Sequence, residues 1–382
     1  MRIEPFAVEQ WMNEFETRCD YNLAETCVQS LTVAELLALA DHPADQFRDE
    51  LLSMHLTYGA IPGSERLRAA VAGLYERQSP ENVVATHGAI GANQLVHLSL
   101  VEPGDRVVTA VPNYQQHTSI PASIGADVRP LPLRPENHYL PELDELAALV
   151  GDRAKLVVIT NPNNPTGALM DQGMLEQVAA ICDRAGAWLL CDEVYRGIYQ
   201  AGSGTTASVA DLYDRGISTG SMSKAFSLAG LRLGWVTGPA EVVEAVTVHR
   251  DYNTISVGMV DDHLATIALE NAEAILRRNR ALVRANNATV DRWVDAQDGV
   301  HWVRPEGGTT GLLHYAGAMP SRDLCVDLLT TTGVLLTPGS ALGVEGTLRL
   351  GYANDPAILA DGLSQLGPYL QTAPGLKTSA IS

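Results

Sequence analysis

The middle of the chain alternates short apolar runs with stretches of helical periodicity, and this alternation is the feature that most constrains the fold. The runs at residues 106–111, 155–160 and 187–191 have the composition of buried strands. A helical stretch at about residues 171–184 separates the last two. Such alternation is typical of a parallel α/β sheet with helices on both faces. Because ligands of these sheets bind at the carboxyl ends of the strands, we expect functional side chains in the segments that follow them.

The sequence pattern changes near residue 275. A long charged helix begins there and is followed by shorter strand-like pieces around residues 309–314, 334–337 and 347–352. This pattern predicts a second, smaller α+β domain. The expected division is an N-terminal arm that joins the small domain (1–45), a large domain (46–275), a small domain (276–370) and a flexible tail (371–382).

Charge and composition exclude several classes of function. The 382 residues include 26 Lys and Arg against 45 Asp and Glu, and the net charge of −19 argues against nucleic acid or an anionic membrane surface as partner. No apolar run approaches the roughly 18 residues that a membrane span needs, and the first residues do not resemble a secretory signal. The five cysteines lack the spacing of a disulfide framework or a zinc site. We therefore expect a cytoplasmic protein without a metal.

Four segments that follow predicted strands carry unusual polar residues. Residues 86–94 (THGAIGANQ) open a helix with small residues, whose exposed N–H groups suit a phosphate. Residues 161–167 (NPNNPTG) form a rigid turn rich in amides, and residues 191–195 (CDEVY) place an acid at a strand end, where burial is costly without a positive partner. Residues 221–235 hold a lysine between hydroxyls and an arginine eight residues later, which suits an amine nucleophile beside an anion clamp. Taken singly, each segment also fits a plain turn, a helix cap or a solvated surface residue.

Taken together and in this order, the four segments resemble the aspartate-aminotransferase superfamily of pyridoxal-5′-phosphate (PLP) enzymes, fold type I, class I/II. The resemblance covers roughly residues 55–355 and depends on NPNNPTG, DEVY and SxSK…GLRLG at their spacings. It implies an α/β fold with a mostly parallel central sheet in the large domain and a smaller α+β domain. It also implies PLP as cofactor and a reaction at Cα of an amino acid, or of an amino-acid-bearing conjugate, through a quinonoid intermediate.

The resemblance also assigns roles to individual residues. Lys224 corresponds to the lysine that forms the Schiff base and moves the Cα proton, and Asp192 to the acid that keeps the pyridine nitrogen protonated. Asn164 and Tyr195 correspond to the pair that binds the phenolic oxygen of the ring, with Asn164 also bordering the substrate. The remaining expected cofactor contacts are Tyr114 on the ring face and Gly88, Ala89, Ile90, Ser221, Ser223 and Arg232 around the phosphate.

Two further assignments concern the substrate and a partner subunit. Arg349, in LRLGY, matches the arginine that binds the substrate α-carboxylate, for which a planar guanidinium is suited. Tyr58, in YGAIPGSERLR, resembles the tyrosine that reaches the phosphate of the neighbouring subunit. The resemblance therefore implies a homodimer with shared active sites.

Two segments depart from the family pattern. Residues 22–30 (NLAETCVQS) stand where many members carry a glycine-containing turn that touches the substrate. Glu25 and Cys27 either line the substrate pocket or pack as arm residues on the small domain. His117, shortly after Tyr114, either supplies an extra acid or base or is a hydrogen-bonded loop residue. These features resemble the capreomycidine-synthase-like branch of antibiotic-pathway PLP enzymes.

The motifs leave the reaction type open. The frequency of activities in the family favours an aminotransferase. The N-terminal departure favours a specialised PLP enzyme of secondary metabolism that catalyses β-elimination, cyclisation, or decarboxylative or oxidative deamination. A third hypothesis, a regulator that uses such a domain as an effector sensor, requires a DNA-binding module, for which we expect too little sequence before Tyr58.

Overall fold

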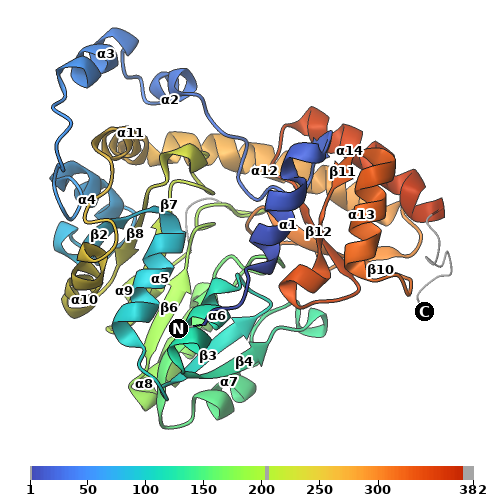
Figure 1. The fold of residues 1–382 in the computed structure, drawn as a ribbon, viewed down its shortest axis with the longest axis horizontal. Coiled ribbons are helices and arrows are strands. Elements are labelled where there is room, and N and C mark those ends of the chain that lie inside the picture. The colour runs from blue at the N-terminus through green and yellow to red at the C-terminus, as the bar shows by residue number, and fades with distance from the viewer. Residues whose placement is uncertain (1, 203–205, 373–382) are drawn as a thin grey trace.

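The computed structural model describes residues 2–202 and 206–372, and a seven-stranded sheet forms its centre (Figure 1). The strand order is β2-β8-β7-β6-β5-β3-β4, with β7, β6, β5, β3 and β4 parallel to one another and β8 antiparallel to both of its neighbours. The bounds are Val83–Thr86 (β2), Arg106–Val111 (β3), Asp127–Pro132 (β4), Ala154–Thr160 (β5), Trp188–Asp192 (β6), Gly216–Ser221 (β7) and Gly234–Thr237 (β8). The prediction of a mostly parallel sheet is therefore confirmed.

Helices cover both faces of this sheet because its central strands are apolar on both sides. On β5, Val157 and Ile159 belong to one hydrophobic cluster, whereas Leu156 and Val158 belong to another on the opposite face. The helices of this region are Glu65–Ala72 (α4), Gly88–Leu100 (α5), Gln116–Ile124 (α6), Leu143–Val150 (α7), Gln172–Ala185 (α8), Val209–Leu212 (α9), Ala240–Asp251 (α10) and Met259–Glu270 (α11).

Capping side chains explain where two of these helices begin. The Leu67 N–H donates to Ser64 Oγ (3.1 Å) at the start of α4. The Met174 N–H donates to Asp171 Oδ1 (2.8 Å) at the start of α8, within one residue of the predicted start. Each cap satisfies an N–H group that has no partner inside its helix.

The C-terminal part forms a second, antiparallel sheet of order β12-β13-β10-β9. Its elements are Ala272–Asp295 (α12), Val300–Trp302 (β9), Thr310–Tyr315 (β10), Ser321–Thr332 (α13), Val334–Leu335 (β11), Thr337–Pro338 (β12), Thr347–Gly351 (β13) and Pro356–Thr372 (α14). The piece predicted around residues 334–337 is split, because β11 pairs with the N-terminal arm and β12 joins this sheet. Residues 371 and 372, predicted as part of the tail, belong to α14, and residues 373–382 lie outside the described residues.

The first part of the N-terminal arm packs on the C-terminal part of the chain. The elements of the arm are Ala7–Phe15 (α1), Tyr21–Asn22 (β1) and Val33–Leu39 (α2), and Ala44–Ser53 (α3) crosses the predicted boundary at residue 45. β1 pairs in parallel with β11, and the indole N–H of buried Trp11 donates to the Leu336 carbonyl (3.0 Å). In Figure 1, α1 lies on the small-domain side, whereas α2 and α3 extend past the large domain. None of the helices in the described ranges combines the length and apolar character that a bilayer span requires.

Candidate active site

A cavity of about 360 Å³ opens at the carboxyl ends of the central strands. One side, here called the sheet wall, comes from the ends of β5, β6 and β7 and the start of α5, and the other, the N-terminal wall, comes from α1 and the segments before and after β1. β13 completes the cavity with Arg349. The predicted residues that line it are Glu25, Cys27, Ala89, Ile90, Tyr114, Asn164, Asp192, Tyr195, Ser221, Ser223, Lys224, Arg232 and Arg349. The volume suits a small-molecule ligand.

Asp192 is the last residue of β6 and is only 5% exposed. Its Oδ2 accepts a hydrogen bond from Asn93 Nδ2 (2.7 Å), and Asn93 Oδ1 in turn accepts from the Thr219 hydroxyl (2.7 Å). The Val194 N–H donates to Asp192 Oδ1 (3.2 Å). These bonds fix a buried carboxylate that faces the cavity, where it can pair with a positively charged ring nitrogen. Sequence reasoning gave Asn93 no role, although it stands in the GANQ stretch that opens α5.

Lys224 reaches across the cavity to the N-terminal wall. Its Nζ donates to Thr26 Oγ1 (2.5 Å) and to Cys27 Sγ (3.3 Å). Burial alone would lower the pKa of Lys224, but Cys27, Tyr195 and Glu25 outweigh it and the pKa is raised. For the Cys27 thiol, in contrast, burial raises the pKa. The arrangement holds a cationic amine between the two walls.

Backbone and side-chain donors gather at the turn between β7 and β8 and at the start of α5. The Ser223 N–H donates to Ser221 Oγ (3.2 Å), and Arg232 Nη1 donates to Ser223 Oγ (3.4 Å). α5 has no side-chain cap, which leaves its first N–H groups available to an anion. Gly88 has a φ of +66°, and a Cβ there would lie 3.1 Å from Arg232 Nη2, so glycine lets the arginine approach this helix start.

Arg349 is 3% exposed and lies between the two walls. Its Nη1 donates to Asn164 Oδ1 (3.2 Å), and its Nη2 donates to the Ala24 carbonyl (3.1 Å) and to Thr337 Oγ1 (3.1 Å). Its Nε has no partner within the described residues. Burial lowers the pKa of this guanidinium. A buried arginine held by neutral oxygens retains donors and charge for a carboxylate ligand.

The N-terminal wall contains acids that sequence reasoning missed. Glu9 Oε1 accepts a hydrogen bond from the Tyr114 hydroxyl (2.7 Å), and Tyr114 also packs against Phe6 with a centroid separation of 4.6 Å. Burial, Glu25 and Glu9 raise the pKa of Glu16. The additional cavity residues are Val8, Glu9, Met12, Glu16, Ala24, Thr26, Asn93, Thr160, Val194 and Ala229. Nothing in the spacing of the α1 residues indicates a site, because α1 reaches the cavity through tertiary docking.

Two predicted residues lie away from the cavity, whereas Gly88, which is not among its lining residues, stands at the start of α5 beside Arg232. Tyr58 is 71% exposed and lines a separate surface pocket with Met54 and Asp262, so its role at a neighbouring subunit stays a prediction. His117 is fully buried in α6, with its Nδ1 3.2 Å from His97 Nε2 and its Nε2 3.5 Å from Asp192 Oδ2. It does not line the cavity. Of the two interpretations of His117, the structure favours the hydrogen-bonded residue, on a helix rather than in a loop.

The cavity matches the functional groups of PLP. The donors around Arg232 suit the phosphate, and the buried Asp192 carboxylate suits the pyridine nitrogen. Asn164 and Tyr195 suit the phenolic oxygen, and the Lys224 amine suits the aldehyde. Within residues 2–202 and 206–372, no group of three or more His, Cys, Asp and Glu side chains is arranged so that it could hold a metal ion. The residues present therefore fit PLP.

The fold and this cavity together define a class of proteins, the PLP-dependent enzymes of fold type I. The chain belongs to the family described as aminotransferase class I and II, whose sequence model matches residues 36–362. It is therefore a PLP-dependent enzyme of the aminotransferase type that acts on amino-acid substrates.

Known proteins of two kinds resemble the chain. It is 34% identical over 366 residues to the capreomycidine synthase of Streptomyces vinaceus, covering 96% of this chain and 93% of that protein. It is 31% identical over 315 residues to the arginine–pyruvate transaminase AruH of Pseudomonas aeruginosa, covering 79% of each. The crystal structure of the PLP-dependent cyclase OrfR superposes with a TM-score of 0.90 at 28% identity, covering 97% of this chain and 98% of that one.

Proposed function

We propose that the substrate is an amino acid with a cationic side chain. The observation that carries this proposal is that Glu9, Glu16 and Glu25 line the same cavity as Lys224 and Arg349. Carboxylates that line one cavity repel one another even when partly exposed, as Glu9, Glu16 and Glu25 are here, and a guanidinium or ammonium group between them would offset that repulsion. The raised pKa of Glu16, caused by burial and by the other two acids, is consistent with such repulsion. The similarity to a protein named arginine–pyruvate transaminase supports the same class of substrate.

In this proposal each wall binds a different part of the substrate. Arg349 binds the α-carboxylate, and the carboxylates of Glu9 and Glu16 bind the distal cation. The Asn164 amide, which already accepts from Arg349, orients the guanidinium toward the cavity. Binding the substrate at both ends fixes the orientation of the Cα–H bond relative to the Lys224 amine. Part of the binding energy is thereby used to hold the reacting groups in the geometry that the reaction requires.

PLP, when bound, withdraws electrons from Cα and so makes the α-proton removable. We assign the removal and return of that proton to the Lys224 amine, acting as general base and acid. Thr26 and Cys27 hold the amine when it is free. Asp192, oriented by Asn93, stabilises positive charge at the pyridine nitrogen, and the burial of both residues excludes water that would weaken this interaction.

Amino transfer to a 2-oxo acid is the reaction that we propose first. Cyclisation of the substrate is a second candidate, favoured by similarity along nearly the whole chain to capreomycidine synthase and to a PLP-dependent cyclase. The chain itself offers one related feature. Thr26 and Cys27 place a hydroxyl and a thiol beside the Lys224 amine, where they can guide its proton to more than one atom.

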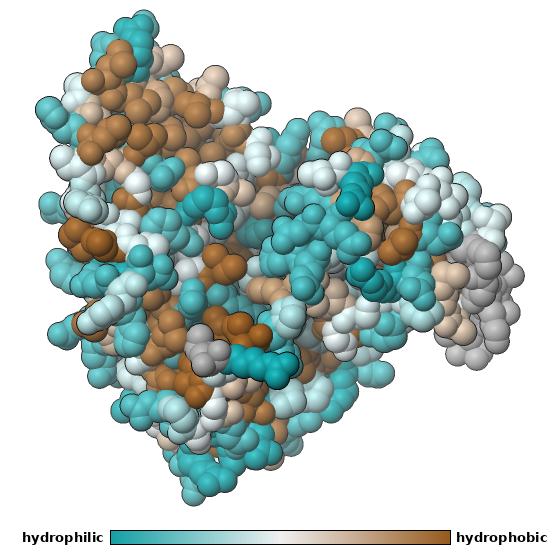
Figure 2. All heavy atoms as spheres, viewed as in Figure 1, coloured by the Kyte–Doolittle hydropathy of each residue, from teal (hydrophilic) through white to brown (hydrophobic). Residues whose placement is uncertain are grey.

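We also propose a homodimer in which Tyr58 reaches the partner's phosphate group. The exposed apolar surface supports it, because Leu52, Leu56, Tyr58 and Tyr252 are exposed by 80%, 79%, 71% and 93%. Figure 2 shows apolar side chains gathered where Figure 1 places α2, α3 and α4. Patches of this kind commonly mark interfaces between proteins. Sedimentation equilibrium should give twice the mass of the chain.

A cytoplasmic location is the remaining part of the proposal. All five cysteines are free thiols, and three of them, Cys182, Cys191 and Cys325, are buried. Free thiols persist most readily in a reducing compartment. Fractionation of the native host should place the enzyme with the cytoplasmic proteins.

A comparison of arginine with citrulline tests the substrate class. The two side chains have nearly the same shape and differ in charge, so contacts to carboxylates are the main source of discrimination. Binding is followed by the absorbance of the bound cofactor, and products with pyruvate or 2-oxoglutarate are identified by mass spectrometry. We expect arginine or a hydroxylated arginine to bind at least about tenfold more tightly, since hydrogen bonds to charged groups contribute about 1.5–3 kcal/mol. Equal binding of citrulline would contradict the cationic-substrate proposal.

The products of the same experiment separate the two reactions. Amino transfer gives a 2-oxo acid from the substrate and an amino acid from the acceptor. Cyclisation of a hydroxylated arginine forms a new C–N bond within the side chain and releases the hydroxyl as water, so its product retains the α-nitrogen and leaves the acceptor unchanged. Retention of the α-nitrogen with consumption of the substrate would overturn the assignment of amino transfer.

A further inference from the structure

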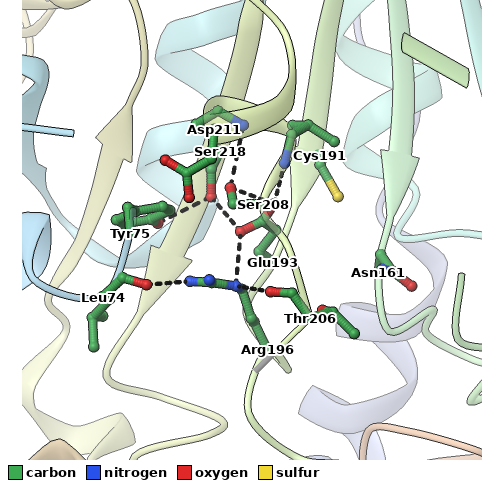
Figure 3. Close-up of polar contacts among 12 residues, drawn as sticks. Leu74, Tyr75, Asn161, Cys191, Glu193, Arg196, Thr206, Ser208, Asp211 and Ser218 are labelled. Carbon is green, nitrogen blue, oxygen red and sulfur yellow. Dashed lines mark hydrogen bonds and ion pairs between the residues drawn. The ribbon is translucent and has the colours of Figure 1, made fainter. Parts of the chain in front are cut away.

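The turn that follows β6 carries a buried polar network that the proposed chemistry does not use (Figure 3). Its centre is Glu193, which is 6% exposed and follows Asp192 in the chain. Successive residues at a strand end point to opposite sides, and Glu193 accordingly borders a small separate cavity while Asp192 lines the active site. A buried carboxylate is costly unless it is well paired, so its retention needs an explanation.

Glu193 is held by donors from three segments. Its Oε1 accepts from the Ser208 hydroxyl (2.8 Å) and from the Val209 N–H (3.2 Å), and its Oε2 accepts from the Ser218 hydroxyl (2.8 Å). Arg196 Nε lies 3.8 Å from the same Oε2. These contacts anchor the carboxylate to α9, to β7 and to its own turn.

Arg196 extends this anchor to the end of α4. Its Nη1 donates to the Leu74 carbonyl (2.8 Å), and its Nε donates to the Thr206 carbonyl (3.0 Å). The guanidinium also lies over the Tyr75 ring, 5.0 Å from the centroid. These bonds tie the Glu193–Arg196 pair to the segments after α4 and before α9.

The turn that carries this pair also carries active-site groups. Residues 193–196 contain Tyr195, and their Val194 N–H donates to the Asp192 carboxylate (3.2 Å). The Ala225 N–H, next to Lys224, donates to the Val194 carbonyl (3.4 Å). A rotation of this turn would therefore displace the acid, the phenol and the lysine at the same time.

We propose that the Glu193–Arg196 pair is a positioning device that fixes the direction of the Asp192 carboxylate and the Tyr195 phenol toward the cofactor. Neither Glu193 nor Arg196 lines the active-site cavity, so both residues act on the cofactor site through the turn formed by residues 193–196. This role is independent of the cationic substrate proposed above. The titratable groups near the pair are Tyr75, Cys191, Tyr199 and Asp211, contributed by the segments packed around it.

The test compares two isosteric substitutions in the same region. Glu193→Gln removes the charge at the centre of the network. Asp211→Asn removes an equally buried charge whose Oδ atoms accept from the Glu76 and Arg77 N–H groups (3.0 and 2.9 Å), outside the turn. For each holoenzyme, the absorbance of the bound cofactor is recorded as a function of pH, and the pH at the middle of the transition is called the midpoint. The dissociation constant of PLP and the thermal unfolding temperature are measured as well.

We expect Glu193→Gln to weaken PLP binding by about tenfold and to lower the pH midpoint, because a misdirected Asp192 stabilises positive charge on the cofactor less well. Asp211→Asn should lower the unfolding temperature and leave the midpoint in place. A midpoint that does not move in Glu193→Gln would overturn the proposal and leave Glu193 a structural residue.

Arg196→Lys provides a milder second variant if Glu193→Gln fails to fold. It keeps the positive charge but cannot bond to both the Leu74 and the Thr206 carbonyls with a planar fork. A shift of the midpoint in the same direction, smaller than that of an Asp192→Asn reference, supports the proposal. An unchanged midpoint in folded Arg196→Lys holoenzyme contradicts it.

Discussion

The two walls of the cavity differ in how they are built. The sheet wall consists of side chains at the ends of successive parallel strands, such as Asn164 after β5 and Asp192 at the end of β6. The N-terminal wall consists of α1 and irregular segments, from which Glu9, Glu16 and Glu25 project. The first depends on sheet topology, whereas the second depends on how the arm docks onto the small domain.

This difference assigns the chemistry at Cα to the sheet wall and the selectivity for the substrate to the N-terminal wall. A sheet edge is rigid, and groups placed there keep the orientation that proton transfer at Cα requires. An arm attached through β1–β11 pairing and the Trp11 bond can change its side chains without disturbing that edge. Family members can therefore share one cofactor site and differ in substrate.

Loss of the lysine on the sheet wall should have the largest effect. Lys224→Ala removes the group to which we assign proton transfer, and such groups contribute about 10²–10⁴-fold to rate. We expect turnover to fall by at least about 10⁴-fold, because the covalent attachment of PLP is lost as well. Single-turnover kinetics with added PLP measure the change, and borohydride should fix PLP to the wild-type chain only. Turnover within tenfold of wild type would contradict the role of Lys224.

The next effect concerns Arg349, which lies between the walls. Arg349→Met should raise the KM for the amino acid by about 10- to 100-fold, because it removes charged hydrogen bonds to the α-carboxylate. We expect a smaller change in kcat once substrate is saturating. Arg349→Lys keeps the charge and should recover part of the affinity, since a lysine lacks the bidentate fork. An unchanged KM in both variants would place the carboxylate elsewhere.

The two walls also differ in how well the sequence predicts them. Asn164 and Asp192 follow apolar runs that are recognisable as strands, so parallel topology brings them together. Lys224 and the phosphate-facing residues were predicted from their resemblance to family motifs, because β7 (GISTGS) lacks the apolar pattern of a buried strand. Glu9 and Glu16 carry no such signal. Their placement depends on contacts such as Trp11 with Leu336, which join residues more than 300 positions apart. Glu25 and Cys27 were predicted only as one of two alternatives, because an irregular segment has no periodicity from which to read its exposed side.

A charge on the N-terminal wall should alter selectivity while leaving the chemistry intact. Glu16→Gln is expected to reduce the preference for arginine over citrulline by about tenfold, because a neutral amide offers the cation no charge. Glu14→Gln is the matched control, since Glu14 lies two residues earlier, in the last turn of α1, but pairs with exposed Arg322 (3.2 Å) outside the cavity. Competition between the two substrates gives the ratio of their kcat/KM values. An equal change in both variants would mean that the effect is not specific to the cavity.

The smallest effect couples the two walls through Glu25 and Lys224. Burial alone would raise the pKa of Glu25, but Lys224 and the N–H groups of Cys27 and Thr26 outweigh it and lower the pKa below 4.5. A carboxyl with a lowered folded-state pKa stabilises the fold above its unfolded-state pKa, and this contribution is lost as the pH falls through the folded-state value. In cofactor-free protein, Glu25→Gln should cost on the order of 1 kcal/mol at pH 7. Urea unfolding should show that the difference from wild type shrinks as the pH falls below 4.5.

Lys224→Met supplies the control for this coupling, because it removes the cation that lowers the Glu25 pKa. In that background, Glu25→Gln should cost less at pH 7, and the pH dependence of the difference should be weaker. The four proteins form a double-mutant cycle whose interaction free energy measures the electrostatic coupling between Glu25 and Lys224. If Glu25→Gln costs the same with and without Lys224, the amide donors alone hold Glu25. The N-terminal wall would then fold independently of the lysine that it faces.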